Sequence, residues 1–580
     1  MLISEVMEQT GLSKKAIRFY EDKGLIKVAR KENGYREYSE NEILTLKKIK
    51  SLRMCGISVS DIKLLFGNIV SLDDLLHKRK KEIESEHGLR FSQLDTVSQI
   101  IDSYKNNEFD LTDDFDETAI HTTSLSDKLA VGIDIGSTTI SATVMDIANN
   151  VQVESYTINN GADIQSQNSQ FYEQDAVAIC NKAIKLLAVI TENYADIKTI
   201  GVTGQMHGIV YIDKMGNAVS NLITWQDKRA DENLANGYSY CDKIFEITGK
   251  KVYTGFGMAT HYYNCINNMV PPTARSFCSI MDYLVMKLTD TTDPVLHSSV
   301  AASFGLFDIG KSDFDTNAIS KLKIDNLIFP KVTDAFYTAG RYKNIPVSIA
   351  IGDNQASFIG SVENIDDTIL INIGTGSQIS MVTDCPEKDE KLELRPLIKD
   401  KYILCGSALC GGKAYAVLEK FFREYMLAFD TDAMPQYEII NKLSYEAYMQ
   451  GKDTPLVEPS FRGKRSDPLQ KAIIMNITEE NFTPAQLVLG FIKGICKELY
   501  DFVGVHCKTK KQIVASGNAV RKIPIMKSVI SDMFGLPVKV SDNKEEASAG
   551  AALFASLTAG LTDNIYKSSS IKNKGENTDE

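Results

Sequence analysis

Short apolar segments rich in β-branched residues alternate with longer helical patterns from Leu129 onward. The segments expected to form strands are LAVGIDIG (129–136), ATVMDI (142–147), TIGVTGQMHG (199–208), VSIAIGD (347–353), TILINIGTG (368–376), ILCGSALCGG (403–412) and QIVASGNAV (512–520). Strands that alternate with helices are typical of α/β layers, whereas an all-β protein has strands separated mainly by turns. The pattern therefore predicts an α/β architecture for most of the chain.

The first 66 residues follow a different pattern of short helices. Residues 3–7 predict a first helix, Thr10–Leu12 a tight turn, and Ser13 the N-cap of a second helix that stops at Gly24. Residues 30–38 predict a turn flanked by aromatic and basic residues, consistent with a small wing. Ser39 then caps a third helix, in which apolar residues recur at helical spacing from Ile43.

Three further segments have weaker patterns. Residues 71–104 predict a charged helix whose apolar positions are too irregular to indicate a coiled coil. Residues 105–127 are acidic and aperiodic, so we expect a linker there. Residues 564–580 are expected to be disordered.

Composition narrows the class of protein. At 580 residues the chain is too long for a single core, and 43% hydrophobic content is ordinary for a globular protein. No segment approaches the roughly 18 apolar residues of a membrane span, and no signal peptide is recognisable at the start. The ten cysteines lack a CxxC pair, which favours reduced thiols in a cytoplasmic protein.

Charge is unevenly distributed. The whole chain carries −12, but residues 1–66 hold 13 Lys or Arg and 9 Asp or Glu. An acidic body with a basic head predicts that any contact with nucleic acid is confined to the N-terminal segment.

Two glycine hairpins bracket the most informative tetrapeptide. GIDIGSTT (132–139) and INIGTGS (371–377) share the order apolar, Asp or Asn, Ile, Gly, Ser or Thr, and Gly352-Asp353-Asn354-Gln355 lies between them. A strand ending in Gly-Ser/Thr exposes backbone N–H groups and a hydroxyl, which are donors for phosphate oxygens. The repeat predicts a duplicated phosphate-binding domain, with Asp353 as a candidate base for phosphoryl transfer.

The N-terminal segment carries candidate DNA contacts. TGLSKKAIRFYEDKGLI, GYREY and MCGISVSDIKLLF resemble, in order and spacing, the MerR-type winged helix-turn-helix, although Val28-Ala29 stand where that family often has proline. The resemblance implies an α-helical DNA-binding domain over residues 1–70 and dimerisation through the helix at 71–104, hence a homodimer on double-stranded DNA. The expected DNA contacts are Lys14, Lys15, Arg18, Tyr20, Arg30, Tyr35 and Arg36.

The remainder of the chain, from 129 to about 560, resembles the FGGY carbohydrate kinases. The resemblance implies two ribonuclease-H-like domains related to actin and hexokinase, with a sugar-side domain at 128–362 and a nucleotide-side domain at 363–563. It also implies ATP as co-substrate and Mg²⁺, with Asp353 as the catalytic base and Asp134 holding the ion through water.

The same resemblance assigns the binding residues. The QMHG and TWQDKR motifs supply the expected sugar contacts, which are Gln205, Met206, His207, Trp225, Asp227 and Asn354. The expected ATP contacts are Gly136, Ser137, Thr138, Thr139, Gly374, Thr375, Gly376, Ser377, Gly517, Asn518 and Arg521. The family usually has a run of glycines near 517, and this chain keeps one, Gly517, so the resemblance supports the choice of nucleotide less than it supports the transfer chemistry.

Each motif also has a purely structural interpretation, such as a tight turn at GxxGST or a core tryptophan at 225. Their joint occurrence favours a kinase site. TWQDKR, TGFGMAT and GDNQAS resemble the sedoheptulokinases of the family more than its xylulokinases, so sedoheptulose 7-phosphate is the expected product, with D-xylulose as the alternative substrate. Two other hypotheses stay open: a regulator whose kinase fold only senses sugar, and a head that dimerises the enzyme without binding DNA.

Overall fold

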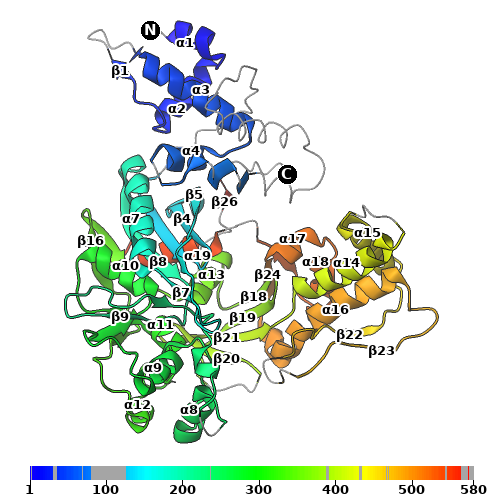
Figure 1. The fold of residues 1–580 in the computed structure, drawn as a ribbon. Helices are drawn as coiled ribbons and strands as arrows, with labels where there is room; N and C mark the ends of the chain where they lie inside the picture. Colours follow the sequence, from blue (N-terminus) through cyan, green and yellow to red (C-terminus); the bar gives the residue numbers. More distant parts are fainter. Residues whose placement is uncertain are drawn as a thin grey trace.

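The computed structural model describes residues 1, 3–30, 36–67, 69–72, 74–76, 78–79, 126–234, 237–386, 391–429, 434–464, 467, 469–541, 545–562 and 572–573. It contains a small helical head and two α/β lobes (Figure 1). The predicted dimerisation helix, linker and C-terminal tail lie almost entirely outside the described residues.

The head has the predicted order of elements. Its helices and strands are α1 (Ile3–Thr10), α2 (Lys14–Asp22), β1 (Ala29–Arg30), β2 (Arg36–Glu37), α3 (Glu40–Met54) and α4 (Val59–Phe66). The side chain of Ser13 caps α2 by accepting from the backbone N–H of Ala16, and Ser39 forms a capping box with Glu42 on α3. β1 and β2 pair antiparallel, as expected for the base of a wing.

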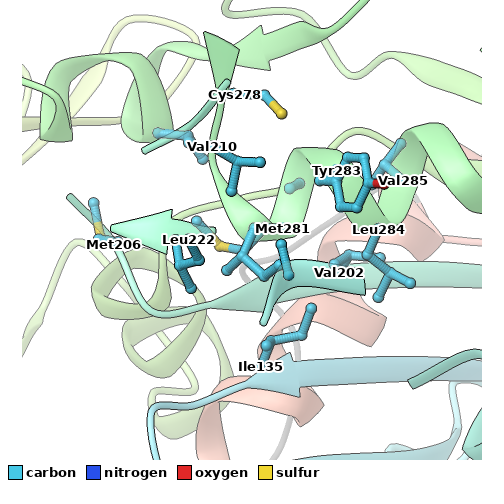
Figure 2. Packing of buried hydrophobic residues seen from close by; sticks show 14 of the residues in the cluster. Ile135, Val202, Met206, Val210, Leu222, Cys278, Met281, Tyr283, Leu284 and Val285 are labelled. Carbon is cyan, nitrogen blue, oxygen red and sulfur yellow. The ribbon is translucent and has the colours of Figure 1, made fainter. Parts of the chain in front are cut away.

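The N-terminal lobe is built on a seven-stranded sheet. Its strands, in spatial order, are β16 (Thr338–Tyr342), β17 (Ile345–Ser348), β8 (Ile197–Gly204), β3 (Leu129–Ile135), β4 (Thr139–Asp146), β5 (Val151–Asn159) and β26 (Lys572–Asn573). The helices of this lobe are α7 (Ala176–Asn193), α8 (Tyr240–Thr248), α9 (Gly257–Ile266), α10 (Ile280–Thr289), α11 (Ser298–Ser303), α12 (Thr316–Leu322) and α13 (Asp353–Ser361). Figure 2 shows part of the core, where Val202 of β8 and Ile135 of β3 lie below Met281 and Leu284 of α10.

Short strands and a 3-10 helix complete the N-terminal lobe. These are β6 (Asp163–Ile164), β7 (Glu173–Gln174), β9 (Val210–Ile212), β10 (Leu222–Ile223), η1 (Arg229–Asp231), β11 (Ser276–Cys278), β12 (Val295–His297), β13 (Phe307–Asp308), β14 (Asp313–Phe314) and β15 (Lys331–Thr333).

The C-terminal lobe has a six-stranded sheet. Its strands, in spatial order, are β20 (Glu393–Ile398), β21 (Lys401–Ala408), β19 (Ser377–Thr383), β18 (Thr368–Ile373), β24 (Gln512–Ser516) and β25 (Val538–Val540). The other elements of this part of the chain are α14 (Gly412–Leu427), α15 (Tyr437–Met449), β22 (Leu456–Glu458), β23 (Ile473–Met475), α16 (Pro484–Val503), η2 (Gly504–Thr509), α17 (Asn518–Lys522), α18 (Met526–Phe534) and α19 (Glu546–Thr558).

The two sheets repeat one topology. β3 pairs antiparallel with β4 and parallel with β8, and β18 pairs antiparallel with β19 and parallel with β24. The turn after each central strand is one of the two glycine hairpins. The duplication predicted from the sequence is therefore present in the fold.

Two helices join the lobes. α13 packs with buried residues of the C-terminal sheet, while α19, which follows that sheet in sequence, packs across β3, β4 and β8 of the N-terminal sheet. α13 and α19 also pack against each other so closely that a Cβ on Gly550 would lie 1.8 Å from the carbonyl oxygen of Ala356. A Cβ on Gly132 of β3 would lie 1.7 Å from the carbonyl oxygen of Ser548. In space, α19 therefore belongs with the N-terminal lobe.

Gly550→Ala should disrupt this joint. The added methyl group meets backbone atoms of Ala356 and Gly360 on α13, so relief requires the two helices to separate, at a cost of about 1–3 kcal/mol or more. Thermal unfolding should show a lower Tm. Gly310→Ala is the matched control, because the nearest atom to its Cβ is 3.5 Å away. An unchanged Tm for Gly550→Ala would contradict the packing described here.

Candidate active site

Asp134 and Asp353 form an acidic pair at the junction of the lobes. Asp134 is near the end of β3, directly opposite Thr203 of the neighbouring strand β8. The hydroxyl of Thr203 donates to the carbonyl of Ile351 at 2.8 Å, and the N–H of Ile351 donates to the carbonyl of Val202 at 3.1 Å. These bonds fix the segment that leads into α13, whose first residue is Asp353.

Burial dominates the electrostatics of this pair. Burial raises the pKa of Asp353 to about 6, although Arg395 and the backbone N–H of Asn354 oppose the shift. Burial likewise raises the pKa of Asp134 to about 7, and the neighbouring carboxylates of Asp353 and Glu545 raise it further. Carboxyl groups whose pKa is raised toward 7 are typical of sites that transfer protons or bind phosphate.

The first hairpin is hydrogen-bonded to the two loops that are predicted to bind sugar, QMHG (205–208) and TWQDKR (224–229). The hydroxyl of Ser137 donates to Gln205 at 3.1 Å and accepts from the indole N–H of Trp225 at 2.9 Å. Gln174 donates to the carbonyl of Ser137 and accepts from Gln205. The hydroxyl of Ser137, predicted to face phosphate, is thus engaged with the sugar loops, whereas Thr138 and Thr139 are exposed.

His207 is held in a fixed orientation. Its φ is +72°, its ring stacks on Phe256 at 4.3 Å, and its Nδ1 lies 2.7 Å from the carbonyl oxygen of Ser303. Its backbone N–H donates to the hydroxyl of Ser303. A non-glycine residue in the left-handed region is often found at functional sites, where the surrounding contacts overcome its strain.

A cavity of about 1400 Å³ opens between the lobes beside these residues. From the N-terminal lobe it is lined by Met206, His207, Phe256 and Ser303, and from the C-terminal lobe by Arg395, Cys405 and Ser407. Asn354, a predicted sugar contact, accepts from the thiol of Cys405 at 3.1 Å. Of the expected sugar residues, Met206 and His207 line the cavity. Asn354, which follows Asp353, reaches it through Cys405, and Gln205 is bonded to Ser137.

The placement of Asp227 does not support its predicted contact with sugar. Its side chain is completely buried and ion-paired with Arg229, which is 1% exposed, at 2.8 Å. The second carboxylate oxygen accepts from Arg229 and from the backbone N–H of Tyr172. Asp227 thus holds a buried arginine in place, while the neighbouring Trp225 is 48% exposed and can meet a ligand.

The second hairpin is covered by glycines that the sequence interpretation did not single out. Gly411 donates its N–H to the carbonyl of Thr375, and a Cβ on Gly411 would lie 2.4 Å from the carbonyl oxygen of Gly376. Gly412, the first residue of α14, donates to the carbonyl of Gly374. The signal for these residues was the Gly-Gly pair directly after a predicted strand.

The other predicted nucleotide residues are at the ends of β18 and β24. Gly517 has φ +94°, and a Cβ there would lie 2.5 Å from the carbonyl oxygen of Ile373, so only glycine fits next to the second hairpin. Asn518 begins α17, and Arg521 donates to the carbonyl of Ser541. The hydroxyl of Ser377 is buried without a protein partner and can serve a ligand.

Arg395 is a second residue that the sequence did not reveal. It comes from β20 of the C-terminal lobe, its side chain is 14% exposed, and it pairs with Glu393 at 2.8 Å. It is the arginine whose charge opposes the raised pKa of Asp353. An arginine in a strand carries no local motif, so only the fold brings it to the site.

The described residues supply only part of the ligand set that Mg²⁺ requires. Within the described part of the chain, no group of three or more His, Cys, Asp or Glu side chains is arranged to hold a metal alone. Mg²⁺ usually takes one or two carboxylates together with substrate phosphates and water. Asp134, predicted to hold the ion through water, is near the end of the strand that leads into the first hairpin, which is compatible with an ion that brings its own phosphate ligands.

The head presents most of its predicted DNA contacts at the surface. Lys14, Lys15, Arg18 and Arg30 are exposed, and Arg36 pairs with Glu21 at 2.7 Å. Tyr20 differs, because it is 2% exposed and packs in the core of the head, where it supports α2 from inside. Tyr35 lies outside the described residues.

The described residues include no helix long and apolar enough to cross a membrane. All ten cysteines are free thiols.

Family models match nearly all of the described chain. The N-terminal domain of the FGGY family of carbohydrate kinases matches residues 129–360, the C-terminal domain of the same family matches 369–559, and the MerR HTH regulatory family matches 1–68. Among curated proteins, mouse (Mus musculus) sedoheptulokinase is 24% identical over 74% of this chain and 97% of its own length. Xylulose kinase of Staphylococcus xylosus is 22% identical over 74% of this chain and 90% of its own length.

Solved structures show the same fold. A ligand-bound xylulose kinase from Lactobacillus acidophilus superposes with a TM-score of 0.63 at 20% identity, covering 76% of this chain and 91% of that protein. Glycerol kinase from Plasmodium falciparum, solved with ADP, gives a TM-score of 0.62 at 21% identity, covering 76% and 91%.

Asp227→Asn should reduce stability more than it affects sugar binding. The change leaves Arg229 buried beside a neutral amide, and breaking one partner of a buried ion pair costs about 3–5 kcal/mol. Denaturant unfolding measures the loss, with Asp325→Asn, an exposed carboxylate, as the control. Unchanged stability together with a KM for sugar raised about tenfold or more would instead make Asp227 a sugar ligand.

Proposed function

The chain belongs to the FGGY family of carbohydrate kinases and carries an N-terminal MerR-type domain, and on that premise we propose that it is an active ketose kinase. The proposed reaction transfers the γ-phosphate of ATP to a terminal primary hydroxyl of the sugar. The observation that carries the proposal is the pair of partly buried carboxyl groups of Asp134 and Asp353, both with raised pKa, next to the first glycine hairpin, which is hydrogen-bonded to Gln205 of the QMHG loop.

In this proposal Asp353 is the general base. A primary alcohol is a poor nucleophile, so a carboxylate must take its proton as the bond to the γ-phosphorus forms. With a pKa of about 6, Asp353 is mostly ionised at neutral pH yet basic enough to accept a proton. His207, Met206 and Asn354 would orient the sugar so that its terminal hydroxyl faces Asp353.

The two hairpins would hold the nucleotide. Backbone N–H groups at Ser137–Thr139 and Gly374–Ser377, together with the hydroxyl of Ser377, donate to phosphate oxygens in this proposal, while Gly136 closes the first hairpin by donating its N–H to the carbonyl of Thr139. Asp134 would hold Mg²⁺ through water together with the nucleotide, and the ion would neutralise charge on the transferring phosphoryl group. Gly517, Asn518 and Arg521 would border the adenosine.

Sedoheptulose is the proposed acceptor, to give sedoheptulose 7-phosphate, with D-xylulose second. The sequence motifs and the curated relatives both support this order. The cavity of about 1400 Å³ accommodates either ketose, so its size does not discriminate between them. The free thiols and ATP chemistry favour the cytoplasm as the place of action.

The test of the function is a panel of ketoses with Mg-ATP and purified protein, with ADP release as the readout. Turnover of sedoheptulose above that of D-xylulose is expected. No turnover with any ketose would reject the kinase proposal in favour of a sugar-sensing regulator.

Asp353→Asn should remove turnover and spare binding. Loss of a general base lowers kcat by about 10²–10⁴-fold, whereas the amide keeps the size of the side chain. Steady-state kinetics and sugar binding by calorimetry measure the two effects separately. Asp366→Asn, an exposed carboxylate, is the control. Retained turnover in Asp353→Asn would remove Asp353 from the role of base.

We propose that the head binds double-stranded DNA as part of a homodimer and regulates transcription. Arg18→Ala should weaken DNA binding by about 1–3 kcal/mol and reduce its salt dependence, because Arg18 is an exposed cation on α2, the predicted recognition helix. Fluorescence anisotropy across a salt series measures both effects, with Lys214→Ala in the N-terminal lobe as the control. Equal affinity of wild type and Arg18→Ala would contradict the assignment, and no DNA binding at all would leave the head with dimerisation alone.

A further inference from the structure

The head is packed onto the N-terminal lobe rather than tethered beside it. Leu64 of α4 is fully buried and belongs to the hydrophobic core of that lobe, and Ile69 packs against the same core. A Cβ on Gly67 would lie 3.1 Å from the side chain of Val189 on α7. Figure 1 shows α4 between the rest of the head and strand β5.

A buried ion pair lies at the centre of this interface. Nζ of Lys63 on α4 is 3.4 Å from the carboxylate of Glu154 on β5, and their side chains are 5% and 11% exposed. The hydroxyl of Tyr194 donates to Glu154 at 2.6 Å, and the hydroxyl of Tyr156 donates to the same oxygen. Burial alone would raise the pKa of Glu154, but Lys63 and the two hydroxyls outweigh it and lower the pKa.

The other end of β5 reaches the phosphate hairpin. Asn160, which directly follows β5, donates its side-chain N–H to the carbonyl of Gly136 at 2.8 Å. Its backbone N–H donates to the carbonyl of Thr138, also at 2.8 Å. Six residues of extended strand, about 20 Å, separate Glu154 from Asn160.

The middle of β5 contacts the joint between the lobes. The hydroxyl of Thr157 donates at 2.9 Å to Glu545, which immediately precedes α19 and raises the pKa of Asp134. One strand therefore contacts the DNA-binding head, the helix that joins the lobes and the first phosphate hairpin.

We propose that β5 couples the nucleotide site to the head, so that nucleotide binding at the first hairpin changes the affinity of the protein for DNA. This inference rests on the proposed kinase function for the identity of the ligand. Asn160 donates to the carbonyls of Gly136 and Thr138 in the first hairpin. In this proposal, phosphate oxygens bind N–H groups of the same hairpin, so nucleotide binding can displace Asn160 and the strand that precedes it. A shift of β5 then changes the distance between the carboxylate of Glu154 and Nζ of Lys63.

The buried pair makes the interface responsive to such a shift. A buried ion pair is favourable only with good geometry, so a small displacement favours separation of the charges and their hydration. The head then has two positions, one closed on Glu154 and one released, and a ligand that prefers either one changes their ratio. Linkage is reciprocal, so DNA must change nucleotide affinity by the same factor.

The experiment measures DNA affinity of the full-length protein with and without saturating Mg-AMP-PNP, using a duplex that the protein itself selects from a random-sequence pool. We expect the Kd for DNA to change by at least about fivefold, the lower end of ordinary allosteric coupling. The Kd for AMP-PNP should change by the same factor when DNA is saturating.

Substitutions at the contact between α4 and β5 test whether the coupling passes through β5. Lys63→Met should reduce the nucleotide effect on DNA affinity to less than about twofold, while Lys185→Met, an exposed lysine of α7, should leave it intact. Tyr194→Phe removes one hydroxyl donor to Glu154 and should weaken the effect in a variant that keeps its fold. Because both variants also change the ratio of the two head positions, the readout is the change in Kd for DNA on adding nucleotide, measured within each variant.

Three results would overturn the inference: equal Kd for DNA with and without nucleotide, full coupling retained in both Lys63→Met and Tyr194→Phe, or failure of the protein to select any duplex. The ketose panel separates this failure from that of the proposed function. Turnover without coupling rejects the inference alone, and coupling without turnover with any ketose rejects the kinase proposal alone.

Discussion

The close contact of α13 with α19 is the constraint on which the site depends. Glycine and alanine let the backbones of the two helices touch, and the same glycine-mediated approach lays α19 across the central strands of the N-terminal sheet. Asp353 is the first residue of α13, and Glu545 immediately precedes α19. Because each helix covers a different sheet, their crossing sets the distance between the lobes and brings the acidic groups together.

Holding Asp134 and Asp353 close together between the lobes lowers the stability of the folded protein. Burial raises the pKa of both Asp134 and Asp353 toward neutrality, so the fold gives up stability to hold them there. Arg395 of the opposite lobe reduces that cost only in part. A domain that merely sensed sugar would have no need of a buried base at this point, which is the physical argument for an active enzyme.

Much of this arrangement could be predicted from local pattern. Ser13 and Ser39 are caps with a fixed chemistry, and the two Gly-Ser/Thr hairpins repeat in sequence as their strands repeat in space. What could not be predicted depends on long-range packing. The carboxylate of Asp227 could accept hydrogen bonds from a sugar, but both of its oxygens accept from Arg229. Arg395 and the Lys63–Glu154 pair are single residues from distant segments, and no periodicity marks them.

The central claim is that a chain with a DNA-binding head phosphorylates a sugar at a terminal hydroxyl. Label transfer from [γ-³²P]ATP to sedoheptulose, followed by phosphorus–proton NMR of the product, tests it most directly. The account predicts a phosphomonoester on the terminal methylene carbon, formed in proportion to ADP. Label found only in inorganic phosphate, or on a secondary hydroxyl, would contradict it.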